Sequence, residues 1–81
     1  MSDKDSIFDE ALDTCGLLCP LPVLKARKRL QSMLSGQVLH MTADDPAARV
    51  DVPHFCTEQG HTLLEERDGL DGEIVFLVRK G

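Results

Sequence analysis

Apolar residues recur along this chain with two different spacings, and each spacing predicts a type of secondary structure. In residues 20–34 the apolar positions lie three or four apart, which is the spacing of one face of a helix. They are Val23, Ala26, Leu30, Met33 and Leu34. Residues 38–43 alternate instead, with Leu39, Met41 and Ala43 on one side, as in a half-buried strand. Gly36 separates the two patterns, so we expect it to cap the helix.

A second helical segment is predicted from proline positions. Asp45 followed by Pro46 is typical of an acidic N-cap and the first helical residue. Pro53 disfavours helical geometry at the residue before it. We therefore expect a short turn over 46–50 and a separate helical piece over 53–59.

Three further strands complete the expected fold. They span 10–14, 61–67 and 73–79, and the last two are joined by a hairpin loop over 68–72. Gly60 separates the second helical segment from the strand at 61–67. The resulting order is βαβαββ, which predicts an α/β domain with a mixed four-stranded sheet and both helices on one face.

Composition narrows the class of protein. The chain has 81 residues, which suits a flexible polar segment over 1–9 and a single folded domain over 10–81. Its net charge of −5 argues against direct binding of nucleic acid, which needs a dense basic surface. Since no stretch has the apolar run of a signal peptide or a membrane span, we expect a cytoplasmic protein with reduced thiols.

The candidate reactive group is the thiol in Cys19-Pro20-Leu21-Pro22. Proline is at home at the first helical position, so Pro20 indicates that Cys19 lies at or beside the N-cap. Because the positive end of the helix dipole favours a thiolate, we expect a Cys19 pKa of about 5 to 7.5. No obvious acid–base pair lies near this motif in the sequence.

Four basic residues cluster in the first helix, in a chain whose net charge is negative. They are Lys25, Arg27, Lys28 and Arg29. A basic cluster on the helix that begins at the candidate thiol is suited to steering an acidic partner surface. We therefore predict that these side chains form a partner-docking surface.

Several short motifs resemble those of the TusA/SirA-like sulfur carriers, from about residue 11 to the end of the chain. The motifs of the first half are Leu12-Asp13, Gly16-Leu17, Cys19-Pro20-Leu21-Pro22-Val23 and Arg27-Lys28. Those of the second half are Asp44-Asp45-Pro46-Ala47, Asp51, Pro53, Phe55-Cys56, Gly60-His61 and Val78-Arg79-Lys80-Gly81.

The resemblance implies a two-layer α/β sandwich like the C-terminal domain of a translation initiation factor. It also implies a carrier that takes sulfane sulfur on Cys19 from a cysteine desulfurase or a rhodanese. The sulfur then passes to a relay partner, for example toward tRNA thiolation. Pro20, Pro22, Gly16 and Asp45 would support the thiol. We expect a monomer without metal or cofactor, performing relay chemistry rather than turnover.

Other interpretations stay open at this point. Cys15 and Cys19 are four residues apart and could form a redox or regulatory pair. The chain could also be a non-catalytic protein-interaction domain that needs no reactive thiol. Cys56 fits a small packed core residue. His54, Cys56 and His61 are close in sequence but lack the paired spacing of a structural zinc site.

Overall fold

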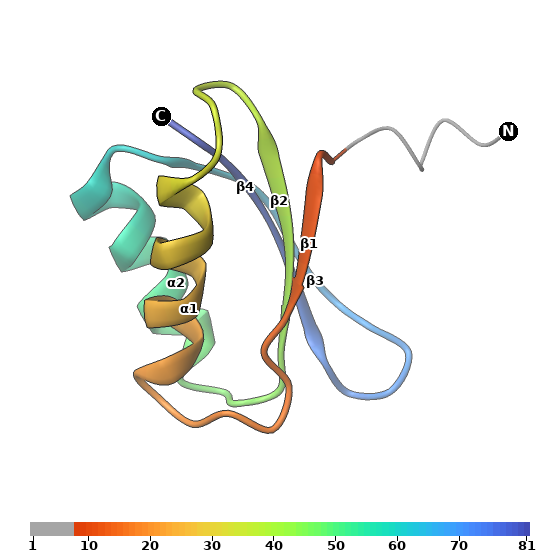
Figure 1. Cartoon of the computed structure of the whole chain (residues 1–81). Coiled ribbons are helices and arrows are strands. Elements are labelled where there is room, and N and C mark those ends of the chain that lie inside the picture. Colours follow the sequence, from red (N-terminus) through yellow and green to blue (C-terminus); the bar gives the residue numbers. More distant parts are fainter. Residues whose placement is uncertain (1–7) are drawn as a thin grey trace, which may run out of the picture.

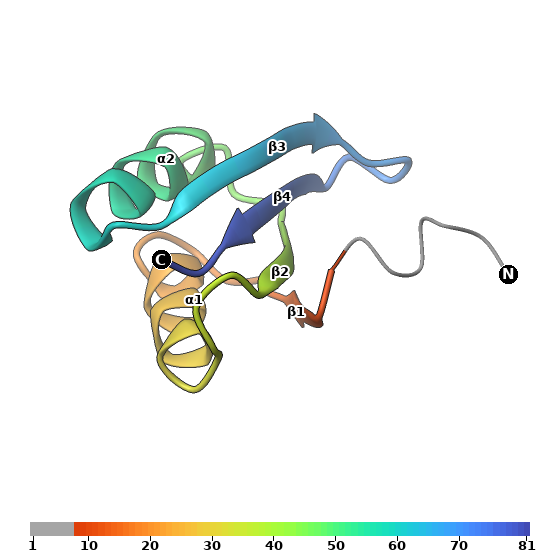
Figure 2. The same cartoon turned by 90° about the horizontal axis from the view of Figure 1, so that it is seen from above.

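Two helices cover one face of a four-stranded sheet in the computed structural model, which describes residues 8–81 (Figure 1). The elements are β1 (Glu10–Asp13), α1 (Leu21–Gln31), β2 (Val38–Ala43), α2 (Ala48–Gln59), β3 (Thr62–Asp68) and β4 (Ile74–Arg79). The view from above shows both helices on the same side of the sheet (Figure 2). The predicted order βαβαββ and the α/β sandwich are confirmed.

The sheet is mixed, with the strand order β1-β2-β4-β3. β1 is parallel to β2, whereas β4 is antiparallel to both β2 and β3. Each helix follows one of the two parallel strands β1 and β2, so both helices begin at the same edge of the sheet. The β1–α1 and β2–α2 loops consequently run side by side at the bottom of Figure 1.

The core lies between the sheet and the helices. The sheet contributes alternating residues of its two central strands, namely Leu39, Met41, Ala43, Ile74, Phe76 and Val78. The helical layer contributes Ala26, Leu30, Met33, Ala48, Val52, Phe55 and Cys56. Each large apolar side chain buried in this layer contributes about 1.5 to 3 kcal/mol of transfer free energy.

The first helix is shorter than its apolar pattern predicted. It ends at Gln31 with Ser32 as the C-cap, and the Ser32 N–H donates to the carbonyl of Arg29. Met33 is still buried, which explains why the apolar spacing continues beyond the helix. Gly36 does not cap α1 but lies in the next turn with a positive φ of 90°.

The second helix is continuous, and the predicted break at Pro53 is wrong. Pro53 is its sixth residue, where a missing N–H removes one bond to the Arg49 carbonyl. Burial of Val52 and Phe55 against the core outweighs this local loss. The predicted N-cap is also displaced, because α2 begins at Ala48. Gly60 ends α2 as predicted, with a left-handed φ of 76°.

The predicted flexible segment over 1–9 is only partly described, since residues 1–7 lie outside the described range. Asp9 is hydrogen-bonded to β2. Its N–H donates to the Val38 carbonyl and its Oδ2 accepts the Val38 N–H, both at 2.8 Å. The Phe8 ring lies 4.8 Å from the His40 ring. Within residues 8–81, neither helix is long and apolar enough to cross a membrane.

Candidate functional site

Two neighbouring carboxylates of the β2–α2 loop hold the backbone of the β1–α1 loop. Asp44 Oδ1 accepts the N–H of Gly16 at 2.9 Å, and Asp45 Oδ2 accepts the N–H of Cys19 at 2.7 Å. Asp45 Oδ1 also accepts the N–H of Ala47 at 3.0 Å. Asp45 therefore links the start of α2 to the cysteine instead of capping α2 directly.

The beginning of the same loop is fixed by the end of β1. The Thr14 hydroxyl is fully buried and donates to the Thr42 carbonyl at 2.6 Å. Asp13 Oδ1 accepts the Cys15 N–H at 2.9 Å and the Thr42 hydroxyl at 3.1 Å. Gly16 then turns the chain with a positive φ of 88°, which side chains with a Cβ rarely adopt.

These contacts present the Cys19 thiol beside the helix start, at an exposed position. Cys19 lies one residue before the N-cap, which is Pro20, so Pro20 is not the first helical residue as predicted. Pro22 occupies the second helical position and is buried. The Cys19 Sγ lies 2.8 Å from Asp51 Oδ2 of α2, so the thiol donates to this carboxylate.

The contact with Asp51 raises the pKa of the Cys19 thiol, because a carboxylate that accepts the S–H bond stabilises the neutral form. Partial removal of the sulfur from water and the negative charges of Asp51 and Asp45 act in the same direction. The predicted lowering of the Cys19 pKa is therefore wrong for this structure. A carboxylate lies beside the thiol, although no acid–base pair was obvious near the motif in the sequence.

The N–H groups at the start of α1 do little to offset the effect of these carboxylates on the Cys19 pKa. The Leu21 N–H donates to the Leu18 carbonyl at 2.8 Å, and the Leu24 N–H donates to the Pro20 carbonyl at 3.1 Å. Pro22 has no N–H to offer. The first turn of α1 thus directs two of its N–H groups back into the chain, whereas a full negative charge lies in direct contact with the sulfur.

Cys19 lines a cleft of about 300 Å³ between α1 and α2. The apolar residues of the cleft are Pro20, Val23, Leu24 and Phe55. Its polar residues are Arg27, Asp51, His54, Glu58 and Gln59. His54 Nε2 lies 3.3 Å from Glu58 Oε1 on the α2 side. A small sulfur-bearing group that reaches Cys19 would therefore meet both apolar and polar side chains.

Comparison with known proteins assigns this chain to a family. Residues 10–80 match the family described as Sulfurtransferase TusA. The chain belongs to the TusA family. It is 45% identical over 73 residues to a protein of Allochromatium vinosum named Sulfur carrier protein TusA, covering 90% of this chain and 95% of that protein. The resemblance inferred from the sequence motifs is thus confirmed at the level of the family.

A solved structure shares the fold of this TusA family member. It is a SirA-like protein of Desulfitobacterium hafniense, which superposes with a TM-score of 0.79. The match covers 90% of this chain and 99% of the other, at 24% sequence identity. At this identity the likeness supports the two-layer α/β fold.

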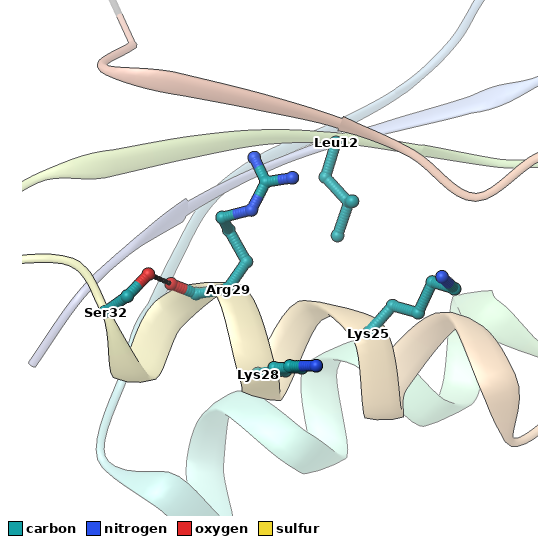
Figure 3. A pocket seen from close by; sticks show the side chains of 5 residues that line it. All are labelled: Leu12, Lys25, Lys28, Arg29 and Ser32. Carbon is teal, nitrogen blue, oxygen red and sulfur yellow. Dashed lines mark hydrogen bonds between the residues drawn. The ribbon is translucent and has the colours of Figure 1, made fainter.

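The four basic residues predicted to dock a partner are divided between two surfaces. Lys25, Lys28 and Arg29 line a separate groove of about 360 Å³ with Leu12 and Ser32 (Figure 3). Arg29 bonds within the chain, to Glu10 Oε1 at 3.3 Å and the Ala11 carbonyl at 3.1 Å. Arg27 instead lines the cleft of Cys19. Partner docking by these residues stays a prediction, and Lys25 and Lys28 are its main candidates.

The other two thiols lie apart from the cleft of Cys19. Cys15 is exposed in an acidic hollow that also contains Asp13, Asp44, Asp71 and Glu73. Partial removal from water and the neighbouring Asp13 raise its pKa. Cys56 is buried in the core, and burial raises its pKa to about 11. Cys15 and Cys19 are both free and line different hollows, and the redox-pair interpretation stays an untested alternative.

The residues considered as a metal site are used elsewhere. Cys56 packs in the core, and His54 faces Glu58. His61 Nδ1 accepts the Gly81 N–H at 3.0 Å. Within residues 8–81, no group of three or more metal-ligating side chains comes together.

Proposed function

We propose that this chain is a sulfur carrier that holds sulfane sulfur as a persulfide on Cys19. The observation that supports the proposal best is the exposed Cys19 thiol, which lines a cleft and whose backbone N–H is held by Asp45. A carrier thiol must reach into a partner's site and return with its cargo, so exposure and a fixed position are both needed. Membership in the TusA family and the relative named a sulfur carrier add to this support.

The donor is a cysteine desulfurase or a rhodanese that presents sulfur as a persulfide. The acceptor is a downstream protein in a relay that ends in tRNA thiolation or in another sulfur-containing product. Transfer exchanges one sulfur–sulfur bond for another, so it needs no oxidant, metal or cofactor. Each encounter moves one sulfur atom, and the chain acts as a shuttle between two partners instead of converting a small substrate by itself.

Intact-protein mass spectrometry tests the proposal. The purified chain is incubated with a cysteine desulfurase and cysteine, and a gain of one sulfur mass that a thiol reductant removes is expected. Cys19→Ser should abolish the gain and leave the fold intact. Cys15→Ser is the matched control, because it makes the same change at another exposed thiol and should load normally. Equal loading of the Cys19→Ser protein would refute the assignment.

A further inference from the structure

The carboxylate of Asp51 is placed to act on the Cys19 thiol. Its Oδ2 lies 2.8 Å from Sγ, although the two residues are 32 positions apart in the sequence. Asp51 lies in the first turn of α2, where its own N–H donates to the Ala47 carbonyl at 2.9 Å. The side chain is half-buried, so its position is set by the packing of α2 against the core. The contact between Cys19 and Asp51 therefore depends on how the fold brings the β1–α1 loop and α2 together.

Other charged or titratable groups also face this region, but the structure engages them elsewhere. Asp45 belongs to the β2–α2 loop, and its two oxygens accept the N–H groups of Cys19 and Ala47. Glu58 of α2 faces His54 at 3.3 Å. Arg27 of α1 lines the same cleft and carries no basic lone pair. Among residues 8–81, Asp51 is the carboxylate that contacts the sulfur.

We propose that Asp51 is a catalytic residue of sulfur transfer, accepting the proton of the Cys19 thiol as this thiol takes up sulfur. The proposal rests on the proposed carrier function and adds a proton acceptor to it. General bases placed in this way contribute about 10²- to 10⁴-fold to the rate of a proton-coupled step. The distance lies within hydrogen-bond reach, which is the geometric requirement for such a base.

The transfer step is balanced without any further reactant. Cys19 Sγ forms a bond to the terminal sulfur of the donor persulfide, while the bond between that sulfur and the donor's cysteine sulfur breaks. The electron pair of the broken bond remains on the donor cysteine as a thiolate. The Cys19 proton passes to Asp51 Oδ2 and is then released to water or to the departing thiolate. The Cys19 sulfur is oxidised as it joins the persulfide, and the donor's cysteine sulfur is reduced to the same extent as it becomes a thiolate. One persulfide and one thiol therefore give one persulfide and one thiol, with no net oxidation.

The dependence of transfer on pH separates this route from attack by a free thiolate. The same contact that lets Asp51 accept the proton also keeps the thiol protonated at neutral pH. A route through free thiolate would accelerate about tenfold per pH unit below the thiol pKa. A route through Asp51 starts from the protonated thiol, so its rate does not follow the fraction of free thiolate. Transfer assisted by Asp51 is therefore nearly independent of pH at neutrality.

The experiment measures single-turnover loading by glutathione persulfide in excess, followed by intact-protein mass spectrometry from mildly acidic to mildly alkaline pH. Asp51→Asn is compared with the native chain, and the ratio of the two rates at each pH removes the titration of the donor itself. We expect the native chain to be at least about tenfold faster at the acidic end. This advantage should shrink as pH rises, because the variant then gains thiolate.

Two controls separate chemistry from structure. Asp71→Asn makes the same charge change in the β3–β4 loop and should leave the native pH profile unchanged. Asp51→Glu keeps a carboxylate and should recover part of the pH-independent rate. The thiolate absorbance of Cys19, taken as the difference from Cys19→Ser, should appear at lower pH in Asp51→Asn than in the native chain. Circular dichroism checks that each variant is folded.

The outcomes distinguish this proposal from the carrier function itself. If Asp51→Asn loads at the native rate, or faster, across the whole pH range, Asp51 is not the proton acceptor although Cys19 remains the carrier. The same conclusion follows if the rate ratio is independent of pH. If the native chain takes up no sulfur from any donor, the carrier function fails first.

Discussion

Cys56 should behave as a core residue whose thiol is silent in the native protein. It is 2% exposed, and burial raises its pKa to about 11. At pH 8 about one molecule in a thousand would carry a Cys56 thiolate, against roughly one in four for an ordinary thiol with a pKa of about 8.5. Acidity alone thus slows alkylation about two hundredfold, and burial slows it further.

Alkylation with iodoacetamide at pH 8, followed by intact-protein mass spectrometry, measures this difference. The native chain should gain two adducts first, on the exposed Cys15 and Cys19, and a third only after unfolding in guanidinium chloride. Peptide mapping then assigns the slow adduct. Modification of native Cys56 at the rate of Cys15 would refute the reasoning, since it would require an accessible thiolate at that position.

Two substitutions extend the same prediction to stability and function. Cys56→Ala should cost about 1 kcal/mol, an ordinary value for a small core change. Cys56→Ser should cost more, because a buried hydroxyl without a partner loses about 1–3 kcal/mol of solvation. Each kcal/mol corresponds to about 4–8 °C in Tm for a domain of this size. Both variants should load sulfur normally. A folded Cys56→Ala protein that fails to load would show that Cys56 handles sulfur.

Three further predictions concern the groove, the loop and the core. Changing both Lys25 and Lys28 to Glu should slow loading by a protein donor at low salt, less so at high salt, at a stability cost within about 0.5 kcal/mol; unchanged kinetics at low salt would contradict docking there. The pKa of Asp45 is lowered below its usual 3.8, chiefly by the hydrogen bond that its carboxylate accepts from the Cys19 N–H. Asp45 therefore stabilises the fold above pH 3.8, and this stabilisation disappears as the pH falls through the lowered pKa. The stability gap between the native chain and Asp45→Asn, measured by urea unfolding, should therefore close in acid, and a constant gap would argue against the bond. Leu30→Ala should cost about 2–5 kcal/mol in the same assay, and a loss below about 1 kcal/mol would mean that the site collapses around the smaller side chain.

Strands were predicted more accurately than helix ends. The alternation at 38–43 matches β2 residue for residue, because each buried position faces the core directly across the sheet. The helix boundaries shifted for a different reason. Met33 packs in the core from a turn, so apolar spacing alone extended α1 too far. Pro53 is accommodated within α2 because core contacts on both sides of it outweigh one missing hydrogen bond.

The candidate site also has one part that local sequence predicts and one part that only tertiary packing sets. Cys19 could be identified from its own neighbours, since two prolines beside a thiol at a helix start form a local motif. The same reasoning could not predict that Asp51 lies beside the Cys19 sulfur. A single acidic residue in the first turn of a helix is common, and its local explanation is the helix dipole. Nothing in the spacing between the two residues indicates that they meet.

The sequence by itself determined the order of the elements, the core-facing positions of β2 and the family, and it singled out Cys19 as the candidate thiol. Each of these depends on neighbouring residues or on a short period. The tertiary structure decided the electrostatics of that thiol. The parallel arrangement of β1 and β2 brings the starts of both helices to one edge of the sheet, which places Asp45 on the Cys19 backbone and Asp51 on its sulfur. A direct contact with a carboxylate prevails over the partial charge of a helix end, so the thiol is more basic than its local sequence indicated.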